Sequence, residues 1–233
     1  LFSVPDKRVK GIHTSVQVNV NRQGNNVIGD AGNEPSLAIN PLNPEQIAVG
    51  WRQFGNIQSD FREAGSAFSS DGGETWQNNG PIEAGLFRSD PVLSADADGT
   101  FFYQSLRVIN PSNLNTAIFT VDQWRSNDGG ENWLDKTNAF GGDKSWYAID
   151  GNESADRGNI YAAWNVAGNS HFPNTFNYST DNGQSYSAPV TIPAKPIFGT
   201  VAVGFDGEVY VVGVDGDTEG LCPFFLFRSN NTI

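Results

Sequence analysis

The sequence predicts an all-β protein built from repeated four-stranded antiparallel units. One short pattern, Ser-x-Asp-x-Gly-x-x-Trp or Tyr, occurs three times at near-even spacing, and a fourth copy begins at Ser229. Aromatic residues are frequent, and turns rich in Gly, Asn and Asp separate short apolar segments, which favours strands over helices. A fixed period of about 50 residues is typical of repeat architectures.

Each repeat is expected to contain the same succession of strands. First strands are predicted at 35–39, 91–95, 146–149 and 200–203. Apolar second strands are predicted at 47–51, 102–106, 160–164 and 209–213, and third strands at 66–68, 117–120, 176–178 and 224–227. A short outer strand closes every unit except the last. Four strands in about 50 residues make one blade of a β-propeller.

The predicted domain organisation is an N-terminal arm over 1–14 followed by one propeller over 15–233. The blades are expected at about 32–82, 88–137, 143–190 and 198–233. Residues 15–20 alternate polar and apolar, which indicates one strand that could close the last blade. Two alternatives stay open: a ring of four blades closed by this strand, or a fragment of a propeller with six or seven blades. An unclosed ring would leave strand edges bare and favour pairing with another chain.

The repeated pattern itself is interpreted as a structural hairpin between third and fourth strands. Its aspartate accepts backbone N–H groups, its glycine takes a positive φ and its aromatic residue packs under the next turn. The predicted structural residues are Ser69, Asp71, Gly73, Trp76, Ser126, Asp128, Gly130, Trp133, Ser179, Asp181, Gly183 and Tyr186.

The opposite face of the blades is the expected location of a site. It carries the starts of first strands, the ends of second strands and the variable loops, and loops on a rigid scaffold commonly hold functional residues. The predicted substrate-binding residues there are Arg52, Arg107, Arg88, Lys144, Trp51 and Trp164. Arginines could grip a carboxylate and tryptophans could stack on sugars. The alternatives are that the arginines form clamps with Glu34 and Asp90, and that the aromatics pack between blades.

Glycoside hydrolysis requires two carboxyl groups, or a tyrosine nucleophile. The catalytic candidates are Asp90, Glu34 and Asp143 at first-strand starts, with Asp60 or Glu63 available in the first variable loop. No metal site and no cofactor are predicted. Calcium is considered at Asp96–Gly99 and at 215–219, but both segments are interpreted first as turns and loops.

Composition excludes several classes of partner. The net charge of −12 disfavours nucleic acid and anionic membranes, and no apolar segment is long enough to span a bilayer. Cys222 is the only cysteine, and the first residues carry no signal-peptide pattern. A secreted or periplasmic protein that meets a glycan or glycoconjugate is the expected setting.

The three motifs resemble the Asp-box, or BNR repeat, of the sialidase-like β-propeller superfamily over nearly all of residues 15–233. The resemblance implies a site on the face away from the boxes. For a sialidase it also implies three arginines on the substrate carboxylate, a Tyr–Glu nucleophile pair and an Asp acid/base. The first of those arginines lies in an Arg-Ile-Pro type motif, whereas this chain has Phe2-Ser-Val-Pro5.

Three functions remain open from the sequence. The chain is a carbohydrate-active glycoside hydrolase relative, a non-catalytic propeller that binds glycan or protein, or a structural propeller without a small ligand. Fold does not choose between them, because function depends on the site.

Overall fold

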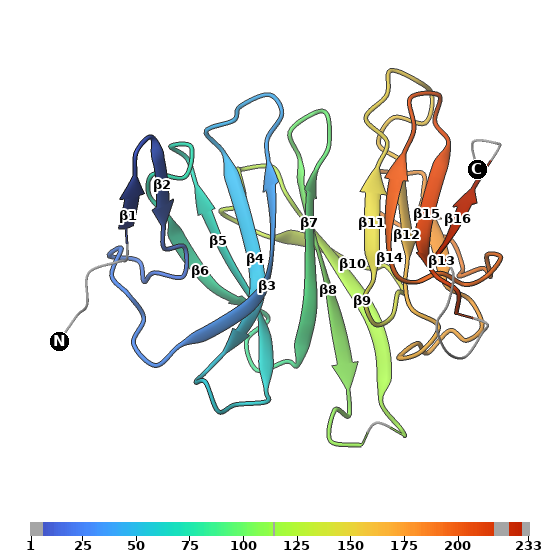
Figure 1. The fold of residues 1–233 in the computed structure, drawn as a ribbon, viewed down its shortest axis with the longest axis horizontal. Helices are drawn as coiled ribbons and strands as arrows, with labels where there is room; N and C mark the ends of the chain where they lie inside the picture. The colour runs from blue at the N-terminus through green and yellow to red at the C-terminus, as the bar shows by residue number, and fades with distance from the viewer. Residues whose placement is uncertain (1–6, 114, 217–223, 230–233) are drawn as a thin grey trace. The chain divides into compact units, whose positions relative to one another are not determined.

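The computed structural model describes residues 7–113, 115–216 and 224–229. These residues form sixteen strands and no helix, and the strands of each repeat pair with one another in chain order (Figure 1). The predicted all-β fold of antiparallel units is therefore confirmed. Among the described residues, none belongs to a helix that could cross a bilayer.

Four sheets follow one another along the chain. The first contains β3 (Ala31–Ile39), β4 (Ile47–Phe54), β5 (Arg62–Ser69) and β6 (Gln77–Ile82). The second contains β7 (Arg88–Ala95), β8 (Phe101–Ile109), β9 (Ile118–Ser126) and β10 (Leu134–Asn138). The third contains β11 (Trp146–Ile149), β12 (Ile160–Ala163) and β13 (Phe176–Ser179), with Val190 bridging to Phe176. The fourth contains β14 (Ile197–Val203), β15 (Val209–Val214) and β16 (Phe224–Arg228).

The predicted strand over 15–20 is not formed. Instead, β1 (Lys7–Lys10) pairs with β2 (His13–Val16) as a separate two-stranded sheet, and Val20 makes only an isolated bridge to Asn26. Residues 7–16 are thus one local hairpin, and a loop follows it. A short alternating segment is satisfied by its nearest partner in sequence, which here is β1.

The chain divides into two compact units, which we describe separately. Unit 1 runs up to Tyr103 and includes Arg125–Leu134, and unit 2 contains Gln104–Trp124 and the chain from Asp135 onward. In unit 1, β7 lies against β3, where the backbone N–H of Leu93 donates to Ser36 Oγ at 3.0 Å. Gly50 permits this packing, because a Cβ there would lie 2.6 Å from both Leu93 and Tyr103 side-chain atoms.

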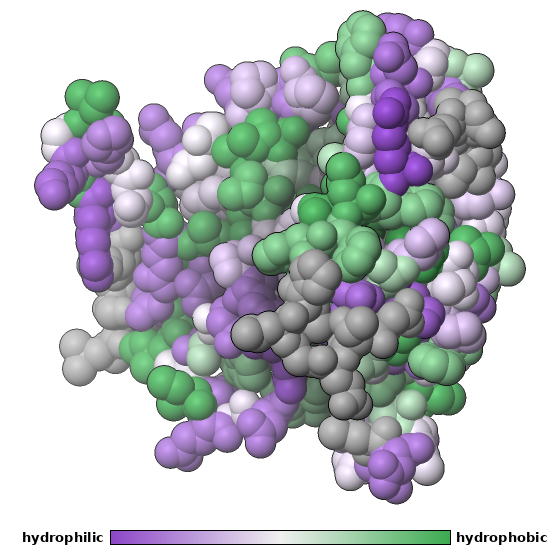
Figure 2. Space-filling model, turned by 45° about the vertical axis from the view of Figure 1, so that its right-hand side comes forward, coloured by the Kyte–Doolittle hydropathy of each residue, from purple (hydrophilic) through white to green (hydrophobic). Residues whose placement is uncertain are grey.

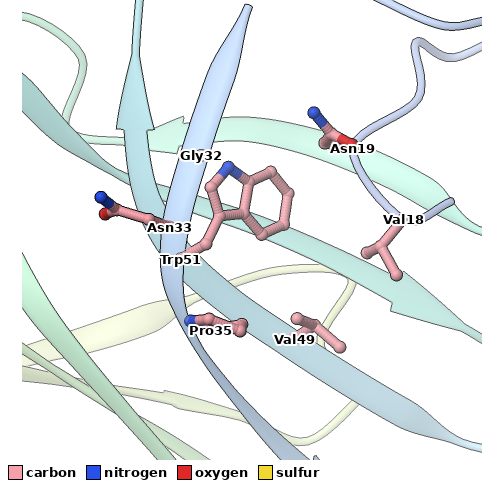
Figure 3. A pocket seen from close by; sticks show the side chains of 7 residues that line it. All are labelled: Val18, Asn19, Gly32, Asn33, Pro35, Val49 and Trp51. Carbon is pink, nitrogen blue, oxygen red and sulfur yellow. The ribbon is translucent and has the colours of Figure 1, made fainter. Parts of the chain in front are cut away.

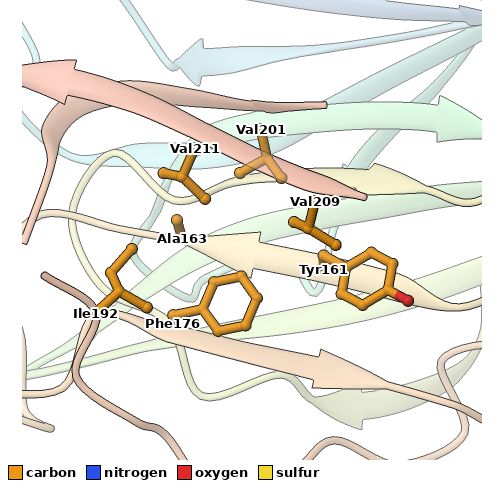
Figure 4. Packing of buried hydrophobic residues seen from close by; sticks show 7 residues of the cluster. All are labelled: Tyr161, Ala163, Phe176, Ile192, Val201, Val209 and Val211. Carbon is orange, nitrogen blue, oxygen red and sulfur yellow. The ribbon is translucent and has the colours of Figure 1, made fainter. Parts of the chain in front are cut away.

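Unit 2 is held together by an apolar cluster between its third and fourth sheets (Figure 4). Its buried members are Tyr161, Ala163, Phe176, Ile192, Val201, Val209 and Val211. Apolar side chains from β12 and β13 therefore face those of β14 and β15, and each fully buried Val or Phe contributes about 1.5–3 kcal/mol. The other face of the fourth sheet exposes Val212 and Leu226, which are paired across β15 and β16. Figure 2, in which the right-hand side of Figure 1 comes forward, shows apolar surface beside hydrophilic surface.

The three repeat motifs (69–76, 126–133 and 179–186) adopt one hydrogen-bonded hairpin. In the first, Ser69 Oγ donates to Asp71 Oδ1 at 2.7 Å and accepts from the Gly73 N–H at 2.9 Å. The same bonds recur from Ser126 to Asp128 and Gly130, and from Ser179 to Asp181 and Gly183. Each aspartate also accepts the N–H four residues later, at 2.8–3.0 Å. The serine hydroxyl and the carboxylate thus replace the backbone partners that a tight turn leaves open.

The second and third motifs also contact the preceding sheet. Gly130 lies over Ala48 of β4, where a Cβ would come within 2.8 Å of the alanine methyl. Its carbonyl accepts a 2.9 Å hydrogen bond from Asn79 Nδ2. In the third motif, the hydroxyl of Tyr186 contacts Gln123 of β9 and accepts from Gln104 Nε2 of β8 at 3.1 Å. Gly130 and Tyr186 thus pack their motifs against the sheet that precedes each of them in the chain.

Candidate functional site

One backbone irregularity recurs near the start of every first strand. A non-glycine residue there has a positive φ, in a region that costs about 1–2 kcal/mol for such residues. The four residues are Glu34 (49°), Asp90 (48°), Lys144 (54°) and Phe198 (49°). In β3 and β14 the pairing register also shifts at this point, between Asn33 and Ser36 and between Ile197 and Thr200. Because the same strained backbone recurs at this position in all four first strands, the side chains there are candidates for a functional site.

In unit 1, Glu34 forms an ion pair with Arg52 at the end of β4. Arg52 Nη2 lies 2.8 Å from Glu34 Oε1, and Arg52 Nε donates to Asn33 Oδ1 at 2.7 Å. The guanidinium also lies 5.9 Å from the centre of the Phe54 ring. The side chains remain 15% and 39% exposed for Arg52 and Glu34, so both border solvent. The predicted clamp between Arg52 and Glu34 is therefore present in the structure.

Asp90 occupies the equivalent position on the neighbouring strand β7. Ser36 and Leu93, which form the hydrogen bond between β3 and β7, closely follow Glu34 and Asp90 respectively. Asp90 Oδ1 accepts from the Ser89 hydroxyl at 2.7 Å. Glu34 and Asp90 both have a positive φ, and each lies two or three residues before the hydrogen bond that joins β3 to β7.

Arg88 is predicted to join these carboxylates as a binding residue. Its side chain is fully buried and paired with Glu83. The pair links the start of β7 to the segment that follows β6. Its burial favours a structural role, and the substrate-binding role of Arg88 stays a prediction.

In unit 2, Asn165 holds Asp143 and the start of β14. Asn165 Nδ2 donates to Asp143 Oδ2 at 3.0 Å, and Asn165 Oδ1 accepts from the Phe198 N–H at 2.7 Å. The buried amide of Asn165 therefore fixes two of the strand starts. Lys144 is half-buried beside Asp143. The sequence predicts roles for Asp143 and Lys144 but not for Asn165, which directly follows the second strand predicted over 160–164.

Two other predicted binding residues of unit 2 differ in their exposure. Trp164 is 1% exposed, donates from Nε1 to the Asn174 carbonyl at 3.1 Å and packs on His171. Its faces are not available to a sugar, which favours the packing alternative. Arg107 on β8 is half-buried, and no described residue forms an ion pair with it.

Trp51 is the wall of a pocket of about 190 Å³ in unit 1 (Figure 3). Val18, Asn19, Gly32, Asn33, Pro35 and Val49 complete the lining. The indole is almost buried, because Gly65 packs against it so closely that a Cβ would lie 2.6 Å away. Trp51 Nε1 donates to Gln53 Oε1 at 2.6 Å. Trp51, predicted to stack on a sugar, thus lines the wall of this pocket.

A second pocket of about 330 Å³ lies beside the end of β4 in the same unit. Its lining includes the carboxylates of Asp30 and Glu63 and the amide of Gln53. Burial raises the pKa of Asp30, although the Ala31 N–H and the Gln53 and Asn19 side chains act to lower it. Glu63 Oε1 accepts from the Gly85 N–H at 2.5 Å. The sequence offered Glu63 as one of two loop carboxylates but missed Asp30, whose segment has no strand pattern.

The two segments at which calcium is considered are Asp96–Gly99 and 215–219. Asp96 Oδ1 accepts the N–H groups of Asp98 and Thr100, as a turn residue does. Residues 217–219 of the other segment lie outside the described residues. Within the described chain, no group of three or more His, Cys, Asp or Glu side chains is arranged to hold a metal ion.

Comparison with known proteins identifies the architecture. A protein of unknown function from Dyadobacter fermentans superposes with a TM-score of 0.61 at 17% identity, over 92% of this chain and 69% of that one. The Hadza microbial sialidase Hz136 gives 0.58 at 12% identity, over 88% of this chain and 44% of that one. A Penicillium chrysogenum α-L-arabinanase in complex with arabinobiose gives 0.56 at 14% identity, over 86% and 63%.

The fold is a β-propeller. The chain spans less than half of the sialidase and under two thirds of the arabinanase. No protein-family model matches the sequence, and no curated protein does.

Proposed function

We propose that this chain is a carbohydrate-active propeller of glycoside hydrolase type that acts on a neutral glycan. The observation that carries the proposal is the pair Glu34 and Asp90, two carboxylates displayed by the same strained backbone position on adjacent first strands. Glycoside hydrolysis in most families needs two carboxyl groups, one as acid and one as base or nucleophile. Three solved proteins that share the fold, a sialidase, an arabinanase and a family 117 glycoside hydrolase, add support.

The charges of unit 1 favour a neutral substrate over a sialic acid. Arg52 is matched by Glu34, and Arg88 is enclosed with Glu83. The neighbouring pocket adds the carboxylates of Asp30 and Glu63. A sugar carboxylate would meet like charge here, whereas sugar hydroxyls would find acceptors. The three motifs fit the Asp-box hairpin of sialidase-like propellers, and we assign the chain to that broader group without its sialidase activity. A secreted or periplasmic setting fits such a substrate.

We assign roles by contact. Glu34, oriented by Arg52, serves as base or nucleophile, and Asp90, oriented by the Ser89 hydroxyl, serves as the acid. Asp143 is tied to Asn165, so we give it a positioning role. Arg107 and Lys144 of unit 2 remain predicted binding residues, and the proposal for Glu34 and Asp90 in unit 1 does not depend on them.

Turnover of a panel of neutral glycosides and sialosides tests this function. Glu34→Gln and Asp90→Asn should each lower kcat by about 10²–10⁴-fold with little change in KM, because acid–base catalysis contributes that much. Glu74→Gln, at an exposed residue of the first motif, is the matched control and should keep full activity. Hydrolysis of sialosides alone, or unchanged activity in both variants, would reject the assignment.

A non-catalytic glycan-binding propeller is the second candidate. The closed ion pair between Arg52 and Glu34 favours it, since a paired carboxylate is a stable hydrogen-bond acceptor for sugar hydroxyls. Saturable binding of a neutral glycan without product, weakened by Glu34→Gln, would select this candidate.

A further inference from the structure

The turn between β11 and β12 is longer than the equivalent turns of the neighbouring sheets. In the second sheet the turn closes from the Asp96 N–H to the Thr100 carbonyl at 2.9 Å. In the fourth it closes from Gly204 to Glu208 at 2.7 Å. In the third the closing bond runs from Asp150 to Asn159 at 2.8 Å, so the chain makes an extra excursion over 151–158.

The excursion carries an oxygen-bearing side chain at every second residue: Asp150, Asn152, Ser154 and Asp156. Calcium loops take ligands from alternate positions in this way, but they usually have glycine at the sixth position and glutamate at the twelfth. Here these positions are Ala155 and Tyr161. The pattern alone therefore describes no more than a polar turn.

An independent observation is the state of the Asp150 carboxylate. Asp150 is fully buried, and its Oδ1 accepts the Asn152 N–H at 2.8 Å. Its Oδ2 is also buried and has no hydrogen-bond partner among the described residues. Buried charged oxygens are normally paired or bound to a metal, because desolvation without compensation is costly.

A second carboxylate approaches the same place. Asn159 Nδ2 lies 3.2 Å from Asp156 Oδ1 and 3.3 Å from the Tyr161 hydroxyl. The backbone carbonyl of Asn159 accepts from the Asp150 N–H at 2.8 Å, and the Asn159 N–H donates to the Asp156 carbonyl at 2.9 Å, so both aspartates are tied to Asn159.

Asn152 has an oxygen available on the same loop. Its Nδ2 donates to the Gly204 carbonyl at 2.8 Å, and this bond leaves Oδ1 as the remaining polar atom of the amide. The loop can therefore combine charged and neutral oxygen donors.

We propose that the β11–β12 turn is a calcium site, with Asp150 Oδ2 and Asp156 as charged ligands and Asn152 Oδ1 and Ser154 Oγ as neutral ligands. The mixed oxygen set on an irregular loop suits Ca²⁺, which accepts flexible coordination, better than Mg²⁺, which requires a near-ideal octahedron. Two carboxylates correspond to a weak site, with a Kd of about 10⁻⁴–10⁻³ M as in extracellular modules. The proposed ligands are not among the residues named in the proposed function.

Terbium luminescence and calorimetry on the whole protein test the site. Tb³⁺ should bind with one-to-one stoichiometry, Tyr161 should sensitise its emission, and Ca²⁺ should displace it. Asp156→Asn, at a half-buried residue, should weaken Ca²⁺ binding at least tenfold, and Asp150→Asn should do the same. Glu153→Gln, an exposed neighbour paired with Arg157, and Asp96→Asn, at the equivalent turn residue of the second sheet, are matched controls that should bind normally.

Thermal unfolding gives a second readout that does not depend on the buried variant folding. Excess Ca²⁺ should raise the Tm of the native protein but not that of Asp156→Asn, since a ligand that binds only the folded state stabilises it. Absence of Ca²⁺ binding to the native protein at about ten times the expected Kd would overturn the proposal. So would equal losses in Asp156→Asn and the two controls.

Discussion

The hydroxyl of Tyr103 donates a 3.0 Å hydrogen bond to the backbone carbonyl of Gly65. Tyr103 is fully buried at the start of β8, and Gly65 lies within β5, so the bond joins the second sheet to the first. Burial raises the pKa of the hydroxyl, which favours the neutral phenol that donates this bond.

Tyr103→Phe should destabilise the protein by about 1–2 kcal/mol. The substitution removes one donor and leaves a buried carbonyl unsatisfied, and such losses fall in this range. Denaturant unfolding measures the change. Tyr210→Phe, at a half-exposed tyrosine of β15, should stay within about 0.5 kcal/mol of the native protein. Equal effects of the two substitutions would contradict the structural role of the Tyr103 bond.

Gly50→Ala should also lower stability, here by overpacking. The added methyl would lie 2.6 Å from atoms of Leu93 and Tyr103, and a well-packed interface relieves such overlap at a cost of about 1–3 kcal/mol. Gly55→Ala is the control, because no atom lies within 4 Å of its would-be Cβ and its φ is not positive. The free energy of unfolding distinguishes them, and a neutral Gly50→Ala would contradict the close packing of Leu93 and Tyr103 on Gly50.

The repeat motifs should make stability depend on pH in acid. The Thr75 hydroxyl and N–H, followed by the Ser69 hydroxyl, lower the pKa of Asp71 to about 2 from its usual 3.8. The pKa values of Asp128 and Asp181 are lowered too: burial opposes the shift, and hydrogen bonds from Asn132 and Ser126, or from Ser185 and Ser179, outweigh it. The unfolded chain therefore binds these protons first.

The stability from these carboxylates should be complete above about pH 4 and disappear as the pH falls toward about 2. Replacing Asp71, Asp128 and Asp181 together by Asn should flatten the Tm profile in this interval. Replacing the exposed Asp98 should leave the profile as it is. An unchanged slope in the triple variant would show that the acid transition arises elsewhere.

His171 should produce a separate pH effect nearer neutrality. Burial lowers its pKa from the usual 6.5, and its ring packs edge-on against Phe140 and Trp164. The stability from the neutral ring is complete above about pH 6.5 and is lost as the pH falls through the lowered pKa. His171→Phe should remove this part of the profile, whereas His13→Gln, on the exposed strand β2, should not. Imidazole NMR titration checks it directly, and a His171 pKa above 6.5 would refute the expectation.

The sequence was sufficient to predict the fold class and the hairpin motifs, because both are local. Asp71, Gly73 and Trp76 recur at fixed spacing, and the turn that they form needs no distant partner. The prediction of a strand over 15–20 was wrong because Val16 pairs with the nearby strand β1. The alternation of polar and apolar residues does not show which partner a strand pairs with.

Site residues were harder to predict because burial depends on neighbouring sheets. Arg88 and Trp164 stand at the predicted strand ends, yet packing encloses both of them. Asp30 and Asn165 matter through contacts with Gln53 and Asp143, residues far from them in sequence. A polar residue at a second-strand end is a signal that could have identified Asn165; Asp30 gave none.

The left-handed residue near each first-strand start has a consequence for how such proteins diversify. Glutamate, aspartate, lysine and phenylalanine all occupy it, so the backbone accepts acidic, basic and aromatic groups there alike. Substitutions at 34, 90, 144 and 198 would therefore change the side chain that each strand start displays, while the sheets stay the same. A combinatorial library restricted to these four positions is a compact route to new specificities on one unchanged scaffold.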